Sequence, residues 1–236
     1  MPFSRPSHLP YPNTWSRFTT NRGTLRIQDV TEDMQQQAMD LLTTYFTRDE
    51  PPCKYIEIHK HPTALSELQK LWRNALKDNI SIACVVDDDS QPPNIIGLNV
   101  LNVVSKEDKE EPFQTEDSVW AQLFGAVDLV ARSVDIFSEY GVDKYLTAYG
   151  LVVDPQWRGC NVGKELLLAR IPLCKALDIK VTATVFTAAA SQTVAKKAGF
   201  EDLYEITYEE LATKGFVFPN IEKDTKTSKL MALVIN

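Results

Sequence analysis

Between positions 158 and 164, two glycines stand among an arginine and a lysine, a combination suited to holding phosphate. An apolar run at residues 149–153 precedes them and predicts a buried strand. A helical apolar pattern begins at Glu165. A strand, a small-residue loop and a helix together point free backbone N–H groups and the positive helix end at a phosphate. The sequence therefore predicts a phosphate-binding loop over residues 152–164.

The spacing of the glycines excludes two common phosphate-binding loops. A P-loop has four residues between its glycines and Ser or Thr after its lysine. Here three residues separate Gly159 from Gly163, and Glu165 follows Lys164. The dinucleotide fingerprint GxGxxG is broken at Asn161. What remains is the pattern Leu-x-Val-x-Pro-x-x-Arg-Gly-x-(Gly)-x-Gly, or a strand-to-helix turn that binds no ligand.

This pattern resembles motif A of the GNAT superfamily, the acetyl-CoA-dependent N-acyltransferases, whose loop holds the pyrophosphate of CoA. Asn161 stands where the family usually has glycine, and asparagine is the non-glycine residue that best tolerates positive φ. The resemblance implies acetyl-CoA as co-substrate, and it implies a set of contacting residues. They are Leu151, Val152, Val153, Arg158, Gly159, Cys160, Asn161, Val162, Gly163 and Lys164.

Within the superfamily the chain resembles the insect arylalkylamine N-acetyltransferases. Those enzymes carry a glutamate followed by a proline after the first helix, as at Glu50 here. They also carry serines around a later helix, where this chain has Ser191 in one position and Thr187 in the other. The resemblance implies catalytic roles for Glu50, Ser191 and Thr187. Pro52 replaces the leucine that usually follows Glu-Pro, which leaves the identity of the amine open.

The chemistry of amine acetylation explains why a carboxylate is needed. An amine with a pKa of about 10.4 is neutral in roughly one molecule in a few thousand at pH 7, so removing its proton costs about 4–5 kcal/mol. A positioned base lowers that cost. Glu50 is the candidate, with apolar neighbours that would raise its pKa by desolvation. Asp49 is its nearest rival, and an exposed loop carboxylate is the alternative.

Two further steps of acetyl transfer each need a hydrogen-bond or proton donor. The thioester carbonyl would be polarised by a backbone N–H of strand 151–153, if that strand splays from strand 179–186 as in GNAT folds. The family commonly has a tyrosine that protonates the leaving sulfur, and this chain has Ala195 there. Ser191, one helical turn earlier, is the candidate replacement, unless solvent supplies the proton.

The composition of the chain limits which partners and which compartment are expected. A net charge of −7 in 236 residues argues against nucleic acid as the main partner. No secretory signal or transmembrane run is visible, and the four cysteines have no CxxC spacing, so we expect a cytoplasmic protein with free thiols. His59 and His61 have no further ligands nearby in sequence, so no metal is expected. A small amine is the expected partner, and a monomer the expected state.

The order of predicted elements matches the GNAT fold from residue 24 onward, so the expected class is α/β (α+β), with a mostly antiparallel mixed sheet flanked by helices and one splayed parallel pair. Residues 1–23 are predicted to be an irregular lead-in, and residues 24–236 a single domain. Strands are predicted at 24–30, 80–86, 95–104, 149–153, 179–186, from 200 and at 229–235. Helices are predicted at 31–46, 62–78, 118–140, 162–177, which Pro172 should kink or end early, and 187–198.

Three functions remain open at this stage. The first is transfer of an acetyl group to a small arylalkylamine or related amine. The second is a GNAT-like module that binds CoA without acetylating amines. The third is acetylation of polyamines or of protein lysines.

Overall fold

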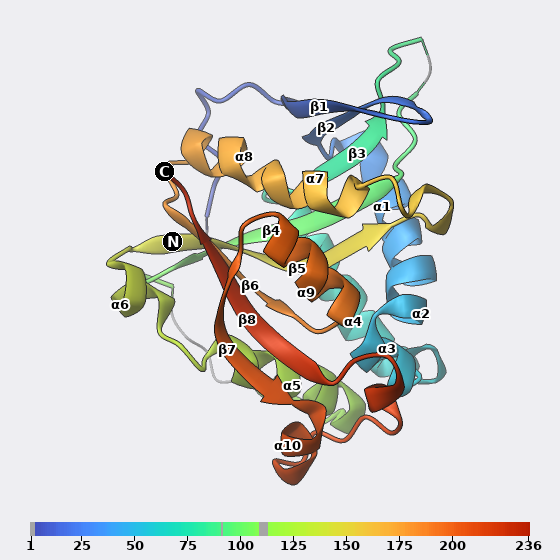
Figure 1. Ribbon diagram of the computed structural model, residues 1–236, viewed down its shortest axis with the longest axis vertical. Helices are drawn as coiled ribbons and strands as arrows, with labels where there is room; N and C mark the ends of the chain where they lie inside the picture. The colour runs from blue at the N-terminus through green and yellow to red at the C-terminus, as the bar shows by residue number, and fades with distance from the viewer. Residues whose placement is uncertain (1–2, 91, 109–112) are drawn as a thin grey trace.

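A computed structural model of the protein describes residues 3–90, 92–108 and 113–236, and over these residues the chain forms an eight-stranded mixed sheet (Figure 1). The strand order is β1-β2-β3-β4-β5-β6-β8-β7. The strands are β1 Thr14–Thr20, β2 Gly23–Asp29, β3 Ile82–Val86, β4 Gly97–Ser105, β5 Lys144–Val153, β6 Val181–Phe186, β7 Glu201–Thr207 and β8 Thr227–Val234.

One strand pair, β5 with β6, runs parallel, and it is also the least paired. Its register contains one residue pair in the described chain, Leu146 with Thr182. The neighbouring pairs β4–β5 and β6–β8 are antiparallel and are matched along most of their lengths. Beyond Leu146 the two parallel strands therefore separate toward their carboxyl ends. This confirms the predicted mixed sheet with a splayed parallel pair.

Helices cover both faces of the sheet. The near face in Figure 1 carries α7 Val162–Leu168, α8 Arg170–Ala176 and α9 Ala189–Lys197. The opposite face carries α1 Gln35–Leu41, α4 Pro62–Leu76 and α5 Ser118–Ala131, whose buried side chains form one large apolar core. Short elements complete the chain: α2 Thr47–Asp49, α3 Pro51–Tyr55, α6 Ile136–Tyr140 and α10 Tyr208–Thr213.

The N-terminal segment is more ordered than an irregular lead-in. Residues Thr14–Thr20 form β1, which pairs antiparallel with β2 through a tight turn at Asn21–Gly23. Asp29 anchors the segment from inside, because its buried carboxylate accepts hydrogen bonds from Trp15 Nε1 at 2.6 Å and from Arg5 at 2.9 Å. The prediction of irregular structure over residues 1–23 is therefore wrong for β1.

The first predicted helix, over residues 31–46, is broken into several turns. After α1 comes a π-helical turn, Leu42–Phe46, and then α2. This helical stretch ends at Asp49, just before the two prolines. The backbone is extended at Glu50, with φ −71° and ψ 123°, and Pro51 opens α3 as its first residue. Proline suits that position because the first helical N–H has no partner to lose.

Two later helices are also divided. The predicted helix over residues 118–140 is interrupted between α5 and α6, where Asp135 caps the second piece through the backbone N–H groups of Phe137 and Ser138. The predicted break near Pro172 is confirmed, since α7 ends at Leu168 and α8 begins at Arg170. Pro172 lies four residues after Leu168 and has no N–H to donate to the Leu168 carbonyl. α10 was not predicted, although its capping box of Thr207 and Glu210 is visible in the sequence.

Gly97 allows α7 to lie close against the sheet. A Cβ placed on Gly97 would come within 2.6 Å of Val162 Cγ1 and 3.2 Å of Leu166 Cδ1. We expect Gly97→Ala to destabilise the fold by about 1–3 kcal/mol, as overpacking does. Thermal unfolding should show a Tm lowered by about 2–4 °C per kcal/mol. Gly163→Ala is the control, because its Cβ would meet no heavy atom closer than 3.7 Å. Equal melting temperatures for the two variants would contradict this account of the packing.

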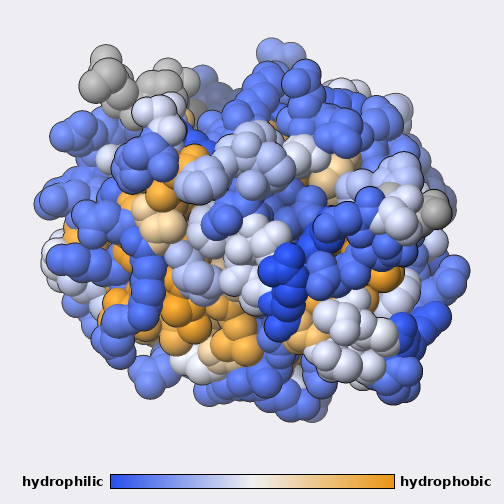
Figure 2. Space-filling model, turned by 90° about the horizontal axis from the view of Figure 1, so that it is seen from above, coloured by the Kyte–Doolittle hydropathy of each residue, from blue (hydrophilic) through white to orange (hydrophobic). Residues whose placement is uncertain are grey.

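Viewed from the side of β1, the surface is mostly hydrophilic, with smaller hydrophobic areas between the polar groups (Figure 2). Among the helices the structure describes, none combines the length and the apolar character needed to cross a membrane.

Candidate active site

The loop between β5 and α7 is shaped by two residues with positive φ. Asp154 starts it by accepting a hydrogen bond from the backbone N–H of Gln156 at 2.8 Å, which caps a single 3₁₀ turn, Pro155–Trp157. Gly159 then has φ +79° and Asn161 has φ +61°. The prediction that asparagine would tolerate the strained position of the loop is confirmed. These two residues turn the chain so that α7 begins directly above the carboxyl end of β5.

The first turn of α7 leaves its backbone donors available. Asn161 precedes the helix but makes no side-chain cap. The first N–H groups of a helix have no partner within the helix, and here they carry the positive end of its dipole. Gly163 keeps this end uncovered because it has no side chain. Cys160, between Gly159 and Asn161, places its thiol 3.9 Å from Asn21 Oδ1 of the β1–β2 turn.

Two backbone N–H groups of β5 point toward the gap beside β6. The N–H of Asp154 donates to Ile96 O at 2.9 Å, on the β4 side. Residues alternate sides along an antiparallel ladder, so Val152 also faces β4, whereas Leu151 and Val153 face β6. Because β5 and β6 have already separated at this level, those two N–H groups have no strand partner in the described chain.

Glu50 and Thr187 meet although 137 positions separate them. Thr187 follows β6, and its hydroxyl donates to Glu50 Oε1 at 2.5 Å. Glu50 Oε2 accepts the backbone N–H of Cys53 at 2.7 Å, which makes Glu50 the N-cap of α3. The structure thus brings together two of the three residues to which the sequence assigns catalytic roles.

The surroundings of Glu50 favour its protonated form more than water does. Burial raises the pKa of this carboxyl above its ordinary value, and the hydrogen bonds from Thr187 and Cys53 offset part of that rise. Burial, then the charge of Glu50, also raises the pKa of the Tyr208 hydroxyl, which donates to Thr187 O at 2.8 Å. Neither Tyr208 nor Cys53 is predicted from the sequence to act at this site, since neither belongs to a motif that indicates such a role.

Asp49, the rival carboxylate, has the opposite environment. Its side chain is 30% exposed and pairs with both Arg48 and Arg158. The hydrogen bond from Arg48, with further help from Arg158, lowers the pKa of Asp49 to about 2. A carboxylate with so low a pKa is a poor proton acceptor at neutral pH, so Asp49 is the weaker candidate base. Its pair with Arg158 instead connects the loop between β5 and α7 to α2.

Ser191 lies in the first turn of α9, where its hydroxyl donates to Ala188 O at 2.9 Å. The structure therefore gives this hydroxyl a local partner on its own helix turn, as is common for serine in helices. Ala195, one turn later, is fully buried.

The turn of the N-terminal hairpin also reaches the loop, which the sequence did not indicate. The guanidinium of Arg22 lies 4.3 Å from the centre of the Trp157 ring, and it donates to Gln156 O. β1 and β2 thus support the loop from outside.

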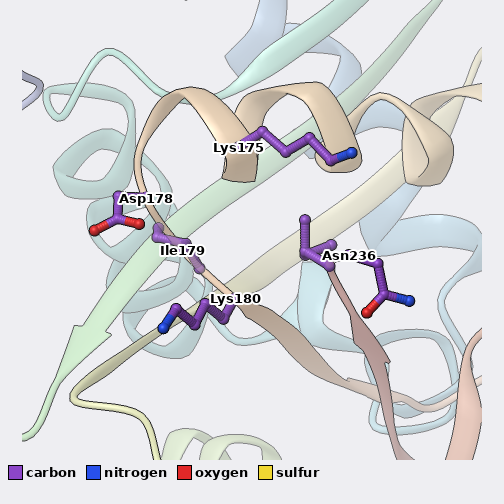
Figure 3. Close-up of a pocket in the computed structure, with 6 residues that line it drawn as sticks. Lys175, Asp178, Ile179, Lys180 and Asn236 are labelled. Atoms are coloured by element: carbon purple, nitrogen blue, oxygen red, sulfur yellow. The ribbon is translucent and has the colours of Figure 1, made fainter.

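A surface hollow lies elsewhere. It has a volume of about 330 Å³ and opens between the end of α8 and the end of the chain, lined by Lys175, Asp178, Ile179, Lys180, Ile235 and Asn236 (Figure 3). This is the far end of α7–α8 from the loop, so the hollow is separate from the candidate active site (Figure 1). No cluster of three or more potential metal ligands occurs within residues 3–90, 92–108 and 113–236.

Comparison with solved structures identifies several proteins that share this fold. A protein of the yellow fever mosquito Aedes aegypti, described as putative arylalkylamine N-acetyltransferase 7, is 34% identical, with a TM-score of 0.91 over 99% of this chain and 100% of that one. Arylalkylamine N-acetyltransferase 2 of the same mosquito is 23% identical, with a TM-score of 0.77 over 90% and 99%. A polyamine N-acetyltransferase of Drosophila melanogaster, described as forming N-acetylagmatine, is 13% identical, with a TM-score of 0.67 over 89% and 100%. Searches of protein-family models and of curated sequences give no match.

Proposed function

The chain belongs to the GNAT superfamily of N-acetyltransferases, and we propose that it transfers the acetyl group of acetyl-CoA directly to a small arylalkylamine or a related amine. The observation that carries the proposal is the Glu50–Thr187 pair beside the open ends of β5 and β6. At the gap between the two separating strands an amine could meet a thioester, and Glu50 lies next to that gap as a base.

The residues of the loop fit the pyrophosphate of CoA. Gly159 and Gly163 expose backbone on that side, and a Cβ on Gly159 would meet nothing within 4 Å. Arg158 and Lys164 add positive charge beside the uncapped start of α7. CoA bound there would extend its thioester between β5 and β6, toward the N–H groups of Leu151 and Val153.

Proton removal is assigned to Glu50. The amine arrives as an ammonium ion, and Glu50 accepts its proton, helped by a pKa raised by burial. The neutral amine then attacks the thioester carbon, and the carbonyl oxygen becomes an oxyanion that a β5 backbone N–H stabilises. Collapse of this intermediate breaks the C–S bond and releases the thiolate of CoA, and the second proton of the attacking nitrogen passes through water to that thiolate, which leaves the neutral amide and CoA thiol as products. Thr187 holds the Glu50 carboxylate in place for the first step.

A turnover screen tests the proposal. Release of CoA thiol should be measured with acetyl-CoA and one amine of each class: tryptamine, phenethylamine, spermidine and a lysine peptide. We expect turnover with the arylalkylamines. Turnover with spermidine or the peptide alone would place the protein with the polyamine or lysine acetyltransferases. Acetyl-CoA binding without turnover of any amine would indicate a binding module.

Arg158→Ala is expected to weaken acetyl-CoA binding by about 1.5–3 kcal/mol, through loss of a charge-assisted contact to phosphate. Arg48→Ala is the matched control, because Arg48 also pairs with Asp49 but lies outside the loop. Titration calorimetry should show weaker binding for Arg158→Ala alone. Similar affinities for both variants would remove Arg158 from the phosphate site.

Ser191→Ala is expected to reduce kcat by less than Glu50→Gln does. A thiol with a pKa of about 8.5 leaves readily as thiolate, so a proton donor contributes little near neutral pH. The effect of the variant should fade as the pH rises past that value. Unchanged kcat from pH 6 to 9 would leave solvent as the proton donor.

A further inference from the structure

A buried arginine without a carboxylate partner lies beneath the separating strands. Arg170 begins α8 and is 0% exposed. Its Nε donates to Asn99 Oδ1 at 2.9 Å, and its Nη1 donates to Thr182 at 3.1 Å and to Thr184 at 2.8 Å. Its Nη2 has no hydrogen-bond partner among the described residues, and no acidic side chain of that part of the chain pairs with it.

Such an arrangement is costly for folding. A buried charge without a counter-charge carries a desolvation penalty of several kcal/mol. An apolar side chain of similar length would fill the same space without that penalty. Arg170 bonds side chains of β4 and β6, the two strands on either side of β5. We therefore ask what this costly side chain does for β5.

Arg170 determines which way the Asn99 amide is turned. A guanidinium has only donors, so it must face the oxygen of Asn99, and the amide nitrogen is then directed away. That nitrogen donates to Gly150 O at 2.8 Å. Gly150 C=O and Leu151 N–H belong to one trans peptide unit and point in opposite directions. Holding the carbonyl toward β4 therefore directs the Leu151 N–H toward the gap beside β6.

We propose that Arg170 is a positioning residue which, through Asn99, aims the Leu151 N–H at the carbonyl oxygen of the bound thioester. This inference rests on the proposed acetyl transfer. The hydrogen bonds run in one direction, from Arg170 to Asn99 to Gly150, so each polarises the next and makes the Leu151 N–H a stronger donor. Arg170 itself never touches the substrate.

A side chain on the opposite face of the sheet holds the preceding carbonyl, that of Tyr149, in the same way. Trp72 Nε1 donates to Tyr149 O at 3.0 Å. Tyr149 is the extra residue of a β-bulge, because Val100 pairs with Gly150 and Leu101 with Ala148. Bulges re-aim backbone groups and are common next to active sites. Side-chain N–H groups thus fix two successive carbonyls at the bulge, one from each face.

Asn99→Asp gives the sharpest test. Aspartate keeps an acceptor for Arg170, and so keeps that side chain paired, but it cannot donate to Gly150 O. Thr184→Val is the matched control, because it removes a partner of Arg170 and leaves the Asn99 bonds in place. Two quantities should be measured: kcat with the best amine, and the infrared C=O band of [¹³C]acetyl-CoA bound without amine.

We expect the band to shift to lower frequency on binding to the wild-type protein and to Thr184→Val, and the shift to shrink in Asn99→Asp. We also expect kcat of Asn99→Asp to fall by about 10–10²-fold, with KM for acetyl-CoA changed by less than about threefold. Arg170→Met should show the same loss of kcat and of band shift. Arg170→Lys, which can still donate to Asn99, should restore part of both.

The outcomes separate this inference from the proposed function. A wild-type protein that binds no acetyl-CoA would overturn both. A wild-type protein that acetylates amines, together with an Asn99→Asp variant of unchanged kcat and band position, would overturn the role of Arg170 and leave the proposed function standing. If Arg170→Met does not fold, Asn99→Asp decides alone.

Discussion

Replacing Glu50 with glutamine is expected to lower kcat/KM for amine acetylation by about 10²–10⁴-fold at neutral pH, because glutamine cannot accept the ammonium proton. Glutamine has the same size and keeps an oxygen that can accept a hydrogen bond at the start of α3, so the fold should survive. An alanine variant would lose that cap together with the base and would be harder to interpret.

The pH dependence distinguishes a base from a structural carboxylate. Burial raises the pKa of Glu50 above the ordinary 4.5, so the acidic limb of kcat/KM should lie above that value. The defect of Glu50→Gln should shrink toward pH 10, where free amine becomes abundant. Asp49→Asn is the control and should leave the acidic limb in place. Equal impairment of Glu50→Gln from pH 7 to pH 10 would indicate that the carboxylate only supports the structure.

The same raised pKa has a consequence for stability. A carboxyl that holds its proton more tightly in the folded state makes the fold less stable as the pH rises from the unfolded to the folded pKa. Glu50→Gln removes this contribution. The stability difference between wild type and variant should therefore change in the variant's favour as the pH rises through that interval.

Gly163→Val is expected to abolish measurable acetyl-CoA binding. A Cβ at Gly163 would make ordinary contacts of 3.7 Å with Val194 and 3.8 Å with Val153, so the helix should still form. The added branches would occupy the space above the first turn of α7, where backbone N–H groups must approach the pyrophosphate closely.

Titration calorimetry and thermal unfolding should be measured together for Gly163→Val and Gly163→Ala. We expect the valine variant to fold and not to bind, and the alanine variant to bind more weakly than wild type. Wild-type affinity in a folded Gly163→Val protein would show that the pyrophosphate does not lie against this helix turn.

Local chemistry decided which parts of the fold could be predicted. The positive φ of Asn161 and the helix break before Pro172 follow from the sterics of single residues, so the sequence was sufficient for both. β1 was missed because prolines dominate residues 1–12 and its pairing depends on β2. Glu50 was expected in a loop, but its extended backbone and its role as a cap depend on the proline that opens the next helix.

The candidate active site was predictable residue by residue, but its contacts were not. Glu50 and Thr187 could each be proposed from the sequence, whereas their hydrogen bond depends on how the end of β6 lies beside α3. Arg170 could not be proposed at all. An arginine in a predicted helix is usually solvated, and only the three-dimensional structure shows that Asn99, Thr182 and Thr184 accept its hydrogen bonds.

The sheet is least connected between β5 and β6, where the described strands share a single residue pair, so we expect it to open as two units, one from β1 to β5 and one from β6 to β8. Proteins open locally along their least connected boundaries, and amide hydrogen exchange reports such opening unit by unit. Exchange should therefore be fastest along the facing edges of β5 and β6, ahead of the paired strands on either side. A ligand seated between them would act as the missing strand, and it should slow exchange on both edges together.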